Sequence, residues 1–491
     1  MLYDELKKYS AGGIYPMHMP GHKRNAGFSA PSEHAAPESL SAPAPLAAFG
    51  LPYDIDITEI HGFDDLRDPH GILMETENLA SELYGSHRAF MLVNGSTAGV
   101  MAAIGAHARH GDKILMARNC HLSVYNAVAL FELKPIYVTP KIDECSGVSC
   151  SIDPAAIEAA MISDPDIKLV VVTSPTYEGV AGDIGAMADI VHEYDVPLLV
   201  DAAHGAHFGF SKRFPESAVH TGADIVVMSL HKTLPALTQC ALLHVGGKLA
   251  KTEEIARYLS IFQTTSPSYV LMASIDRCIR LLADDKERLF RDYEQNLDDF
   301  NARIKALSNF RLLWNVSDIK SRGFHDVDIG KLVIVTKNAG FSGIELSDIL
   351  RVEFKIELEM SCGDYALGMT SICDTQEGFA RLADALLAID GKARGNGIRN
   401  SEFGIRNFDS PKQVLTPGDA LMRSGCFVPI DESFGAMSLE YVWAYPPGVP
   451  VIAPGEIINE SVVSHIVKSF GAGIRLKSTG GKLPEFICVA G

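Results

Sequence analysis

Two short segments carry residue types whose positions suggest shared chemistry. Asp201 directly follows the apolar run 197–200, and Lys232 lies just beyond a second apolar run, 224–228. Both runs are typical of buried strands, and open α/β sheets bind ligands at the carboxyl ends of their strands. We therefore expect the carboxylate and the amine to meet at one ligand. That pair suits pyridoxal phosphate (PLP), because a lysine can form a Schiff base with its aldehyde and an aspartate can hold a proton on its ring nitrogen.

The residues around Lys232 strengthen this interpretation. Ser229 and His231 precede it and could donate hydrogen bonds to a phosphate group. A single lysine at the end of a strand is more often only solvated. The functional interpretation is favoured because Asp201 and a second phosphate-binding candidate accompany Lys232.

That second candidate is the segment Asn94-Gly-Ser-Thr-Ala-Gly99, which follows the apolar run 90–93 and opens a helical stretch. Small residues at a helix N-terminus let backbone N–H groups approach an anion. The hydroxyls of Ser96 and Thr97 add donors. The segment lacks the Gly-Lys-Ser/Thr ending of a Walker loop. By itself, it is better explained as an ordinary helix cap.

Two further positions follow predicted strands. His121 comes after the run 113–116, where its flat imidazole could stack on a pyridine ring or simply begin a helix. Tyr177 and Glu178 follow the run 168–172, where either side chain could line the substrate side, or the segment could simply form a turn.

A metal site built from Asp201, His204 and His207 is the less favoured alternative. Their spacing does not match the two histidines of an HExxH helix, which lie four residues apart. We therefore expect no resident metal.

The elements that must position these residues form an α/β pattern. Helical stretches alternate with continuous apolar runs, which predict strands buried on both faces of a mostly parallel sheet. The runs are 113–116, 135–138, 168–172, 197–200, 224–228 and 241–245. A long amphipathic helix is predicted over 285–308.

The chain of 491 residues is too long for one typical domain. We expect an N-terminal arm (1–70), a PLP-binding large domain (71–300), a small α+β domain (301–395), a linker-like insertion (396–410) and a C-terminal domain (411–491). The insertion repeats Gly-Ile-Arg-Asn within a few residues and receives no function.

Composition excludes several kinds of partner. The formal net charge of -18 argues against nucleic acid or an anionic membrane. No run reaches the ~18 apolar residues of a membrane helix, and no signal peptide is visible. Nine cysteines without a CxxC pair suggest reduced thiols and a cytoplasmic location.

Together, these motifs resemble the Orn/Lys/Arg decarboxylases among the fold type I PLP enzymes, and in particular the compact bacterial biosynthetic arginine decarboxylases. The resemblance covers nearly the whole chain. Besides the segments at Asp201 and Lys232, it rests on Met19-Pro-Gly-His-Lys23, Asp56-Ile-Thr-Glu59, Asp64-Asp-Leu66, Val93-Asn-Gly-Ser-Thr97, Arg118-Asn-Cys-His121, Thr173-Ser-Pro175, Thr264-Thr-Ser-Pro-Ser268, Tyr445-Pro-Pro-Gly448 and Pro454-Gly-Glu456.

The resemblance implies specific roles for these residues. Lys232 would carry the cofactor, Asp201 would pair with its ring nitrogen, and His121 would stack on its face. Ala203 would pack below the ring. The phosphate would be held by Ser96, Thr97, Ser229 and His231. Thr265, in the 264–268 loop, would reach the phosphate of a neighbouring subunit, which implies a homodimer or a larger homo-oligomer.

The chain departs from the family at two places. Ala202 stands where the family has glutamate, and segment 434–440 lacks the family's arginine but keeps Glu440. Since a buried cationic substrate group needs a carboxylate partner, Glu440 is our candidate for that partner, with Asp431 and Glu432 as alternatives.

The expected activity is PLP-dependent decarboxylation of a basic amino acid. Arginine, giving agmatine for polyamine biosynthesis, is favoured by the resemblance, while lysine and ornithine remain open. After loss of CO2, Lys232 or His204 would protonate Cα. An aminotransferase or aldolase would use the same cofactor residues, and an inactive binding protein is the third alternative.

Overall fold

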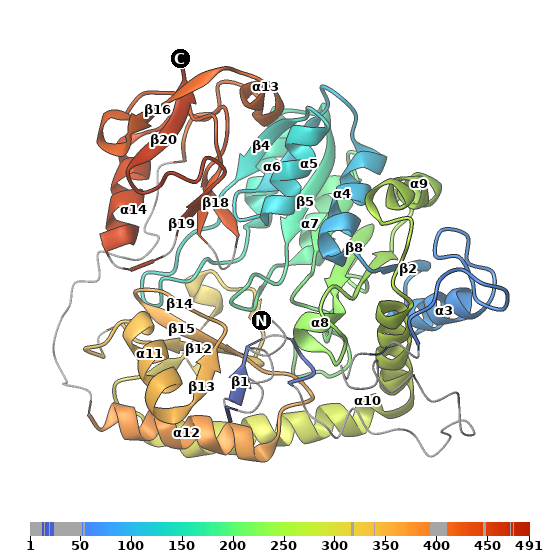
Figure 1. Ribbon diagram of the computed structural model, residues 1–491, viewed down its shortest axis with the longest axis vertical. Coiled ribbons are helices and arrows are strands. Elements are labelled where there is room, and N and C mark those ends of the chain that lie inside the picture. Colours follow the sequence, from blue (N-terminus) through green and yellow to red (C-terminus); the bar gives the residue numbers. More distant parts are fainter. Residues whose placement is uncertain are drawn as a thin grey trace, which may run out of the picture.

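The computed structural model describes residues 12–13, 15–18, 20–23, 52, 55–315, 319–337, 339–392, 410–444, 448–471, 473–474 and 476–491. Most of the predicted insertion 396–410 therefore lies outside the described residues. The fold is built around a seven-stranded sheet with the order β2-β9-β8-β7-β5-β3-β4. Figure 1 shows this sheet with its helices, a smaller unit beside it and a C-terminal unit next to the edge strand β4.

The predicted strands are confirmed. The strands of the sheet are β2 (Arg88–Leu92), β3 (Lys113–Ala117), β4 (Lys134–Val138), β5 (Ile167–Thr173), β7 (Leu198–Asp201), β8 (Ile225–Ser229) and β9 (Ala241–Val245). Strands β4, β3, β5, β7 and β8 run parallel, and β9 is antiparallel to both of its neighbours. The α/β class with a mostly parallel sheet is therefore confirmed.

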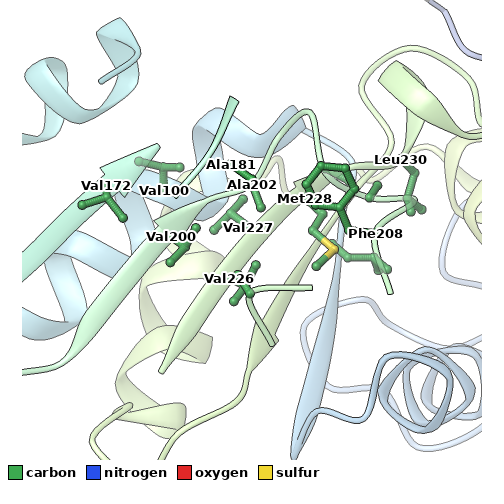
Figure 2. Close-up of a cluster of buried hydrophobic side chains, with 14 of the residues drawn as sticks. Val100, Val172, Ala181, Val200, Ala202, Phe208, Val226, Val227, Met228 and Leu230 are labelled. Atoms are coloured by element: carbon green, nitrogen blue, oxygen red, sulfur yellow. The ribbon is translucent and has the colours of Figure 1, made fainter. Parts of the chain in front are cut away.

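The sheet is buried on both faces, as its continuous apolar runs predict. Val172, Val200, Val226 and Val227 are at most 1% exposed. Figure 2 shows these valines on the central strands, with Phe208 next to Met228. This rigid core fixes the carboxyl ends of β5, β7 and β8, where the candidate residues lie.

Helices connect and cover these strands: α3 (Ile72–Tyr84), α4 (Gly95–His107), α5 (Leu122–Leu130), α6 (Pro154–Ser163), α7 (Ile184–His192), α8 (Leu230–Thr233) and α9 (Thr252–Phe262). Helix α4 packs on β8, β9 and β2, whereas α6 packs on β4 and α7 on β7.

The long helix predicted over 285–308 needs correction. Helix α10 runs from Tyr269 to Arg303, and the next residues, 304–306, form a 3₁₀ turn. It begins earlier because the Ser268 hydroxyl accepts a hydrogen bond from the amide of Leu271, which caps its first turn. The domain boundaries stay a prediction, and the one at residue 300 lies inside this helix.

The small unit contains a sheet of order β10-β12-β15-β14. Its strands are β10 (Arg311–Leu312), β12 (Lys331–Val335), β14 (Met360–Ser361) and β15 (Tyr365–Met369), and its helices are α11 (Gly343–Phe354) and α12 (Gln376–Asp390). Strand β11 (Asp326–Val327) pairs with β6 (Val180–Ala181), which ties the unit to the large domain. Figure 1 shows α12 lying along α10.

The N-terminal segment is also joined to the small unit, because β1 (Tyr15–Met17) pairs in parallel with β13 (Ile356–Leu358). Residues 20–23 then reach α8. The amide of Gly21 donates to the carbonyl of His231 at 2.7 Å, and a Cβ at Gly21 would lie 2.7 Å from the backbone of Leu234. Part of the arm therefore supports the turn that carries Lys232.

The C-terminal unit is a small α+β structure. It contains the strand pair β16 (Gly425–Pro429) and β20 (Phe486–Ala490), and a three-stranded sheet of β18 (Val449–Ile452), β17 (Val442–Ala444) and β19 (Leu476–Ser478). Its helices are α13 (Pro417–Leu421) and α14 (Glu460–Gly471), and α13 packs against α5. Within the described residues, no helix is both long and apolar enough to cross a membrane.

Candidate active site

A cavity of about 700 Å³ opens at the carboxyl ends of the central strands, and all three units contribute to its walls. Ten of the predicted site residues line it: Ser96, Thr97, His121, Tyr177, Asp201, Ala203, His204, Ser229, His231 and Lys232. These residues are far apart in the sequence, and the parallel sheet brings them together.

Two predicted residues do not line this cavity. Thr265 lies in the exposed loop before α10. The side chain of Glu440 is buried in the C-terminal unit, where it accepts hydrogen bonds from the amides of Gly480 at 2.6 Å and Cys488 at 2.7 Å. Its carboxylate therefore fixes a strand and a turn of that unit instead of facing the cavity. The alternatives, Asp431 and Glu432, are exposed and lie outside the cavity lining as well.

The N-terminus of α4 forms one end of the cavity. Its cap residue, Asn94, makes no side-chain cap to the helix, and Gly95 adopts a φ of 72° that a side chain would strain. The hydroxyls of Ser96 and Ser229 lie 2.6 Å apart. Two hydroxyls and the amides of the first turn therefore converge where an anion would be favoured.

Another part of the cavity lining holds a carboxylate and an imidazole. Asp201 ends β7 and is 4% exposed, and one of its oxygens accepts a hydrogen bond from the amide of Ala203 at 3.1 Å. His121 caps α5 by accepting the amide hydrogen of Ser123 on Nδ1 at 3.2 Å. Burial lowers the pKa of His121, with Asp201 opposing the shift and Lys232 adding to it. A neutral, flat ring is thus held beside the carboxylate.

The C-terminal unit fixes this imidazole from the other side. The amide of Leu122 donates to the carbonyl of Gly448 at 3.0 Å. The guanidinium of Arg118 forms a buried ion pair with Glu456 at 3.1 Å and donates to the carbonyl of Pro450 at 3.1 Å. The C-terminal unit therefore contributes directly to the active site, through contacts with the segment that carries His121.

Lys232 is the cavity's amine, and His204 is its immediate partner. Lysine Nζ lies 3.0 Å from Nε2 of His204. Burial lowers the pKa of Lys232, although the charges of Asp201 and Glu359 oppose the shift. A neutral amine is the nucleophilic form, so burial prepares this lysine to attack a carbonyl carbon.

Three carboxylates besides Asp201 line the cavity, and of these the sequence predicts only Glu178 on the substrate side. Glu178 accepts a hydrogen bond from the hydroxyl of Tyr365 at 2.7 Å, and Glu359 accepts one from the hydroxyl of Tyr177. Asp364 lines the same wall. The sequence carries no signal for the other two, because Glu359 lies between β13 and β14 and Asp364 between β14 and β15, and only the fold brings these connections to the cavity.

The comparisons with known proteins agree with this geometry. The family model for the Orn/Lys/Arg decarboxylase major domain matches residues 1–340, and the model for the C-terminal domain of the same enzymes matches residues 407–473. The chain belongs to the Orn/Lys/Arg decarboxylase family.

Relatives within this family extend over nearly the full chain. An arginine decarboxylase of Bacillus subtilis is 33% identical, with 96% of this chain and 94% of that protein covered. An arginine decarboxylase of Halalkalibacterium halodurans is 32% identical, with coverages of 93% and 90%.

Solved structures support the fold. A lysine decarboxylase of Francisella novicida has a TM-score of 0.75 at 19% identity, covering 99% of this chain and 83% of that one. A ureidoglycine-glyoxylate aminotransferase of Bacillus subtilis has a TM-score of 0.53 at 16% identity, covering 66% and 86%. The fold of this decarboxylase-family chain is therefore that of the fold type I PLP enzymes.

The cavity's donor set fits PLP. The phosphate would meet the N-terminus of α4 and the hydroxyl pair, the ring nitrogen would meet Asp201, and the aldehyde would meet the amine of Lys232. Each group of the cofactor thus has a chemically matched residue. Among the described residues, no cluster of three metal-binding side chains is present.

Proposed function

We propose that this protein is a PLP-dependent decarboxylase that converts arginine to agmatine and CO2. The observation that carries the substrate assignment is the relationship to two curated arginine decarboxylases at 33% and 32% identity over nearly the whole length. Arginine, lysine and ornithine all carry a distal cation. The three additional carboxylates of the cavity suit such a group, since a buried cation needs a charged hydrogen-bond partner.

PLP, when bound, supplies an aldehyde for the substrate amine and an electron sink for the electrons left by departing CO2. The residues of this chain hold and tune that group. Lys232 would carry it between turnovers, and Asp201 would keep the proton on its ring nitrogen. His121 and Ala203 would enclose the ring from its two faces.

The phosphate end would be anchored by Ser96, Thr97, Ser229 and His231. Burial lowers the pKa of His231 to about 4, and its Nδ1 lies 3.0 Å from the carbonyl of Cys240. If neutral His231 donates its Nδ1 hydrogen to that carbonyl, its Nε2 can only accept a hydrogen bond and cannot donate one to the phosphate. We therefore assign most of the anion binding to the hydroxyls and to the amides of α4.

Glu178, Glu359 and Asp364 would bind the substrate's guanidinium. A guanidinium offers several donors in one plane, so more than one carboxylate can engage it. Tyr365 and Tyr177 orient two of these carboxylates through their hydroxyls. This set replaces Glu440 as our candidate for recognition of the distal cation.

We also propose that the protein is a homodimer in the cytoplasm and that residues of both subunits contribute to each active site. The amide of Thr264 donates to the side chain of Asn94, which lines the cavity, so the loop with Thr265 lies beside the phosphate end. An exposed loop there can contact a neighbouring subunit. The nine cysteines are all free thiols, as is typical of a reducing compartment.

The test is to incubate the purified protein with PLP and, separately, arginine, lysine and ornithine, and to identify the amine by mass spectrometry. Agmatine from arginine, with far less amine from the other two, is expected. Cadaverine or putrescine as the main product would refute the arginine assignment. A keto acid instead of an amine would point to an aminotransferase. The Lys232→Ala variant should lose both turnover and the cofactor absorbance band.

A further inference from the structure

His204 lies between two lysine amines. Its Nε2 is 3.0 Å from Nζ of Lys232, and its Nδ1 is 2.8 Å from Nζ of Lys331. Lys331 is the first residue of β12 and is 2% exposed, and His204 is 5% exposed. The cavity lining includes Lys232 and His204 but not Lys331. The second lysine therefore lies behind the imidazole, on the side away from substrate.

The hydrogen-bonding rules of these groups restrict where the protons can be. A neutral imidazole has one N–H donor and one acceptor nitrogen, whereas an ammonium group can only donate. Burial, followed by the charges of the two lysines, holds the pKa of His204 well below its usual value, so the ring is neutral. One amine must then accept a hydrogen bond from the ring. The three groups therefore accommodate at most one ammonium, and at least one of the two amines is neutral.

The charges around Lys331 make it the group that can gain and lose this proton. Burial lowers the pKa of Lys331 to about 7, with the negative groups opposing the shift and the other lysines adding to it. The titratable groups that face it are Asp328 and Glu359, the lysines Lys232 and Lys23, His204 itself, and the ring of Tyr177 at 6.0 Å. A carboxylate oxygen of Asp328 also lies 3.2 Å from Nε2 of the buried His207.

The reaction of the proposed function, on which this inference rests, creates a need for such a group. Decarboxylation replaces a carboxylate by a hydrogen, so each turnover consumes one proton. The proton must be available beside the reacting carbon at the moment CO2 leaves, and a group held next to Lys232 can deliver it more directly than bulk water. A buried base that is about half protonated near neutral pH can supply it.

We propose that Lys331 is a positioning residue that stores this proton and passes it through His204 to the amine of Lys232. In the forward step an N–H bond of the Lys331 ammonium breaks as Nδ1 of His204 gains a hydrogen. The Nε2–H bond breaks as Nζ of Lys232 gains a hydrogen. The imidazole changes tautomer and stays neutral. One proton moves across the ring. After Lys232 has given this proton to Cα, water in the cavity that Lys232 lines supplies a new proton to its amine, and the reverse sequence then returns a proton to Lys331.

The test compares Lys331→Met, Lys331→Arg and the control Lys337→Met. Lys337 follows the same strand but donates to a backbone carbonyl near the surface. Methionine keeps the length of the side chain without a proton, and arginine keeps a permanent charge that it does not release near neutral pH. Steady-state kinetics with the active substrate should be measured from pH 5 to pH 9, together with the pH titration of the cofactor absorbance without substrate.

We expect Lys331→Met to bind PLP, to keep KM within about twofold and to lose kcat by about tenfold or more. Its cofactor titration should shift, because the charge of Lys331 no longer acts on the nitrogen of Lys232. Lys331→Arg should fail to restore kcat. Wild-type kcat and an unchanged pH profile in Lys331→Met would overturn the proposal, as would full rescue by arginine.

A measurement without cofactor or substrate separates this proposal from the proposed function. The pKa of Lys331 falls from an ordinary value of 10.5 to about 7 on folding, so folding expels a proton between those pH values. The stability gained by Lys331→Met should therefore be largest below pH 7 and shrink as the pH rises toward 10.5. A stability gain in Lys331→Met that is the same at every pH would overturn the proposal that Lys331 stores a proton. Absence of amine from the wild type would refute only the decarboxylase assignment.

Discussion

The backbone of Gly448 lies against the imidazole of His121. A Cβ at this glycine would be 3.1 Å from Cδ2 of the ring, and the glycine has a φ of 90°. The C-terminal unit therefore closes on the ring that we assign to the face of the cofactor, and only a residue without a side chain allows it to do so.

Replacing this glycine should disturb cofactor binding. We predict that Gly448→Ala lowers the affinity for PLP by about tenfold, because the new methyl group displaces His121 (tenfold corresponds to about 1.4 kcal/mol). The affinity can be measured by titrating PLP into the apo-protein and following absorbance. Gly435→Ala is the matched control, since Gly435 has a similar φ of 80° but open space around its Cβ. Equal effects of both substitutions would mean that backbone strain alone is responsible.

The hydroxyls of Ser96 and Ser229 should act together on the phosphate. Each single change to alanine is expected to weaken PLP binding by about 10- to 100-fold, the usual size for a hydrogen bond to a charged group. Because the two hydroxyls are 2.6 Å apart, the double variant should lose less than the sum of the single losses. Ser260→Ala changes an exposed hydroxyl and serves as the control. Strict additivity in PLP titrations would argue that the two serines do not share one anion.

Glu178 should contribute to recognition of the substrate's distal cation. The Glu178→Gln variant keeps the size of the side chain and an oxygen that can accept the hydrogen bond from Tyr365, but it removes the negative charge. We expect KM for the basic substrate to rise by about 10- to 100-fold, since charge-assisted hydrogen bonds are worth about 1.5–3 kcal/mol. PLP affinity should stay the same. Glu158→Gln, at an exposed position of α6, provides the control. A fall in kcat alone, with KM unaltered, would contradict a recognition role.

Much of this site could be predicted from the sequence, because strands of a buried parallel sheet appear as continuous apolar runs. Continuous apolar runs predicted β7 and β8, and with them the placement of Asp201 and Lys232 at one edge. Lys331 could not be found in this way, since a lysine that opens a strand resembles a solvated residue until the fold places it behind His204. The sequence also favours Glu440 as a substrate ligand, but the backbone amides that bind its carboxylate come from Gly480 and Cys488, about 40 residues or more away, and the sequence around Glu440 does not reveal them.

The buried carboxyl of Glu77 should give the protein a pH-dependent stability that is independent of the active site. Burial raises the pKa of Glu77 to about 7, although the amide of Met91 and the charge of Arg88 oppose the shift. The folded state therefore binds a proton that the unfolded state releases above its ordinary pKa of 4.5. The resulting stabilisation is complete below pH 4.5 and is lost as the pH rises to about 7. The shift corresponds to about 3 kcal/mol.

We expect this part of the decline in unfolding free energy between pH 4.5 and 7 to be absent in Glu77→Gln. The check is denaturant unfolding of both proteins at a series of pH values, with Glu158→Gln as the surface control. Parallel curves for wild type and Glu77→Gln would show that this carboxyl is ionised in the folded state across the range.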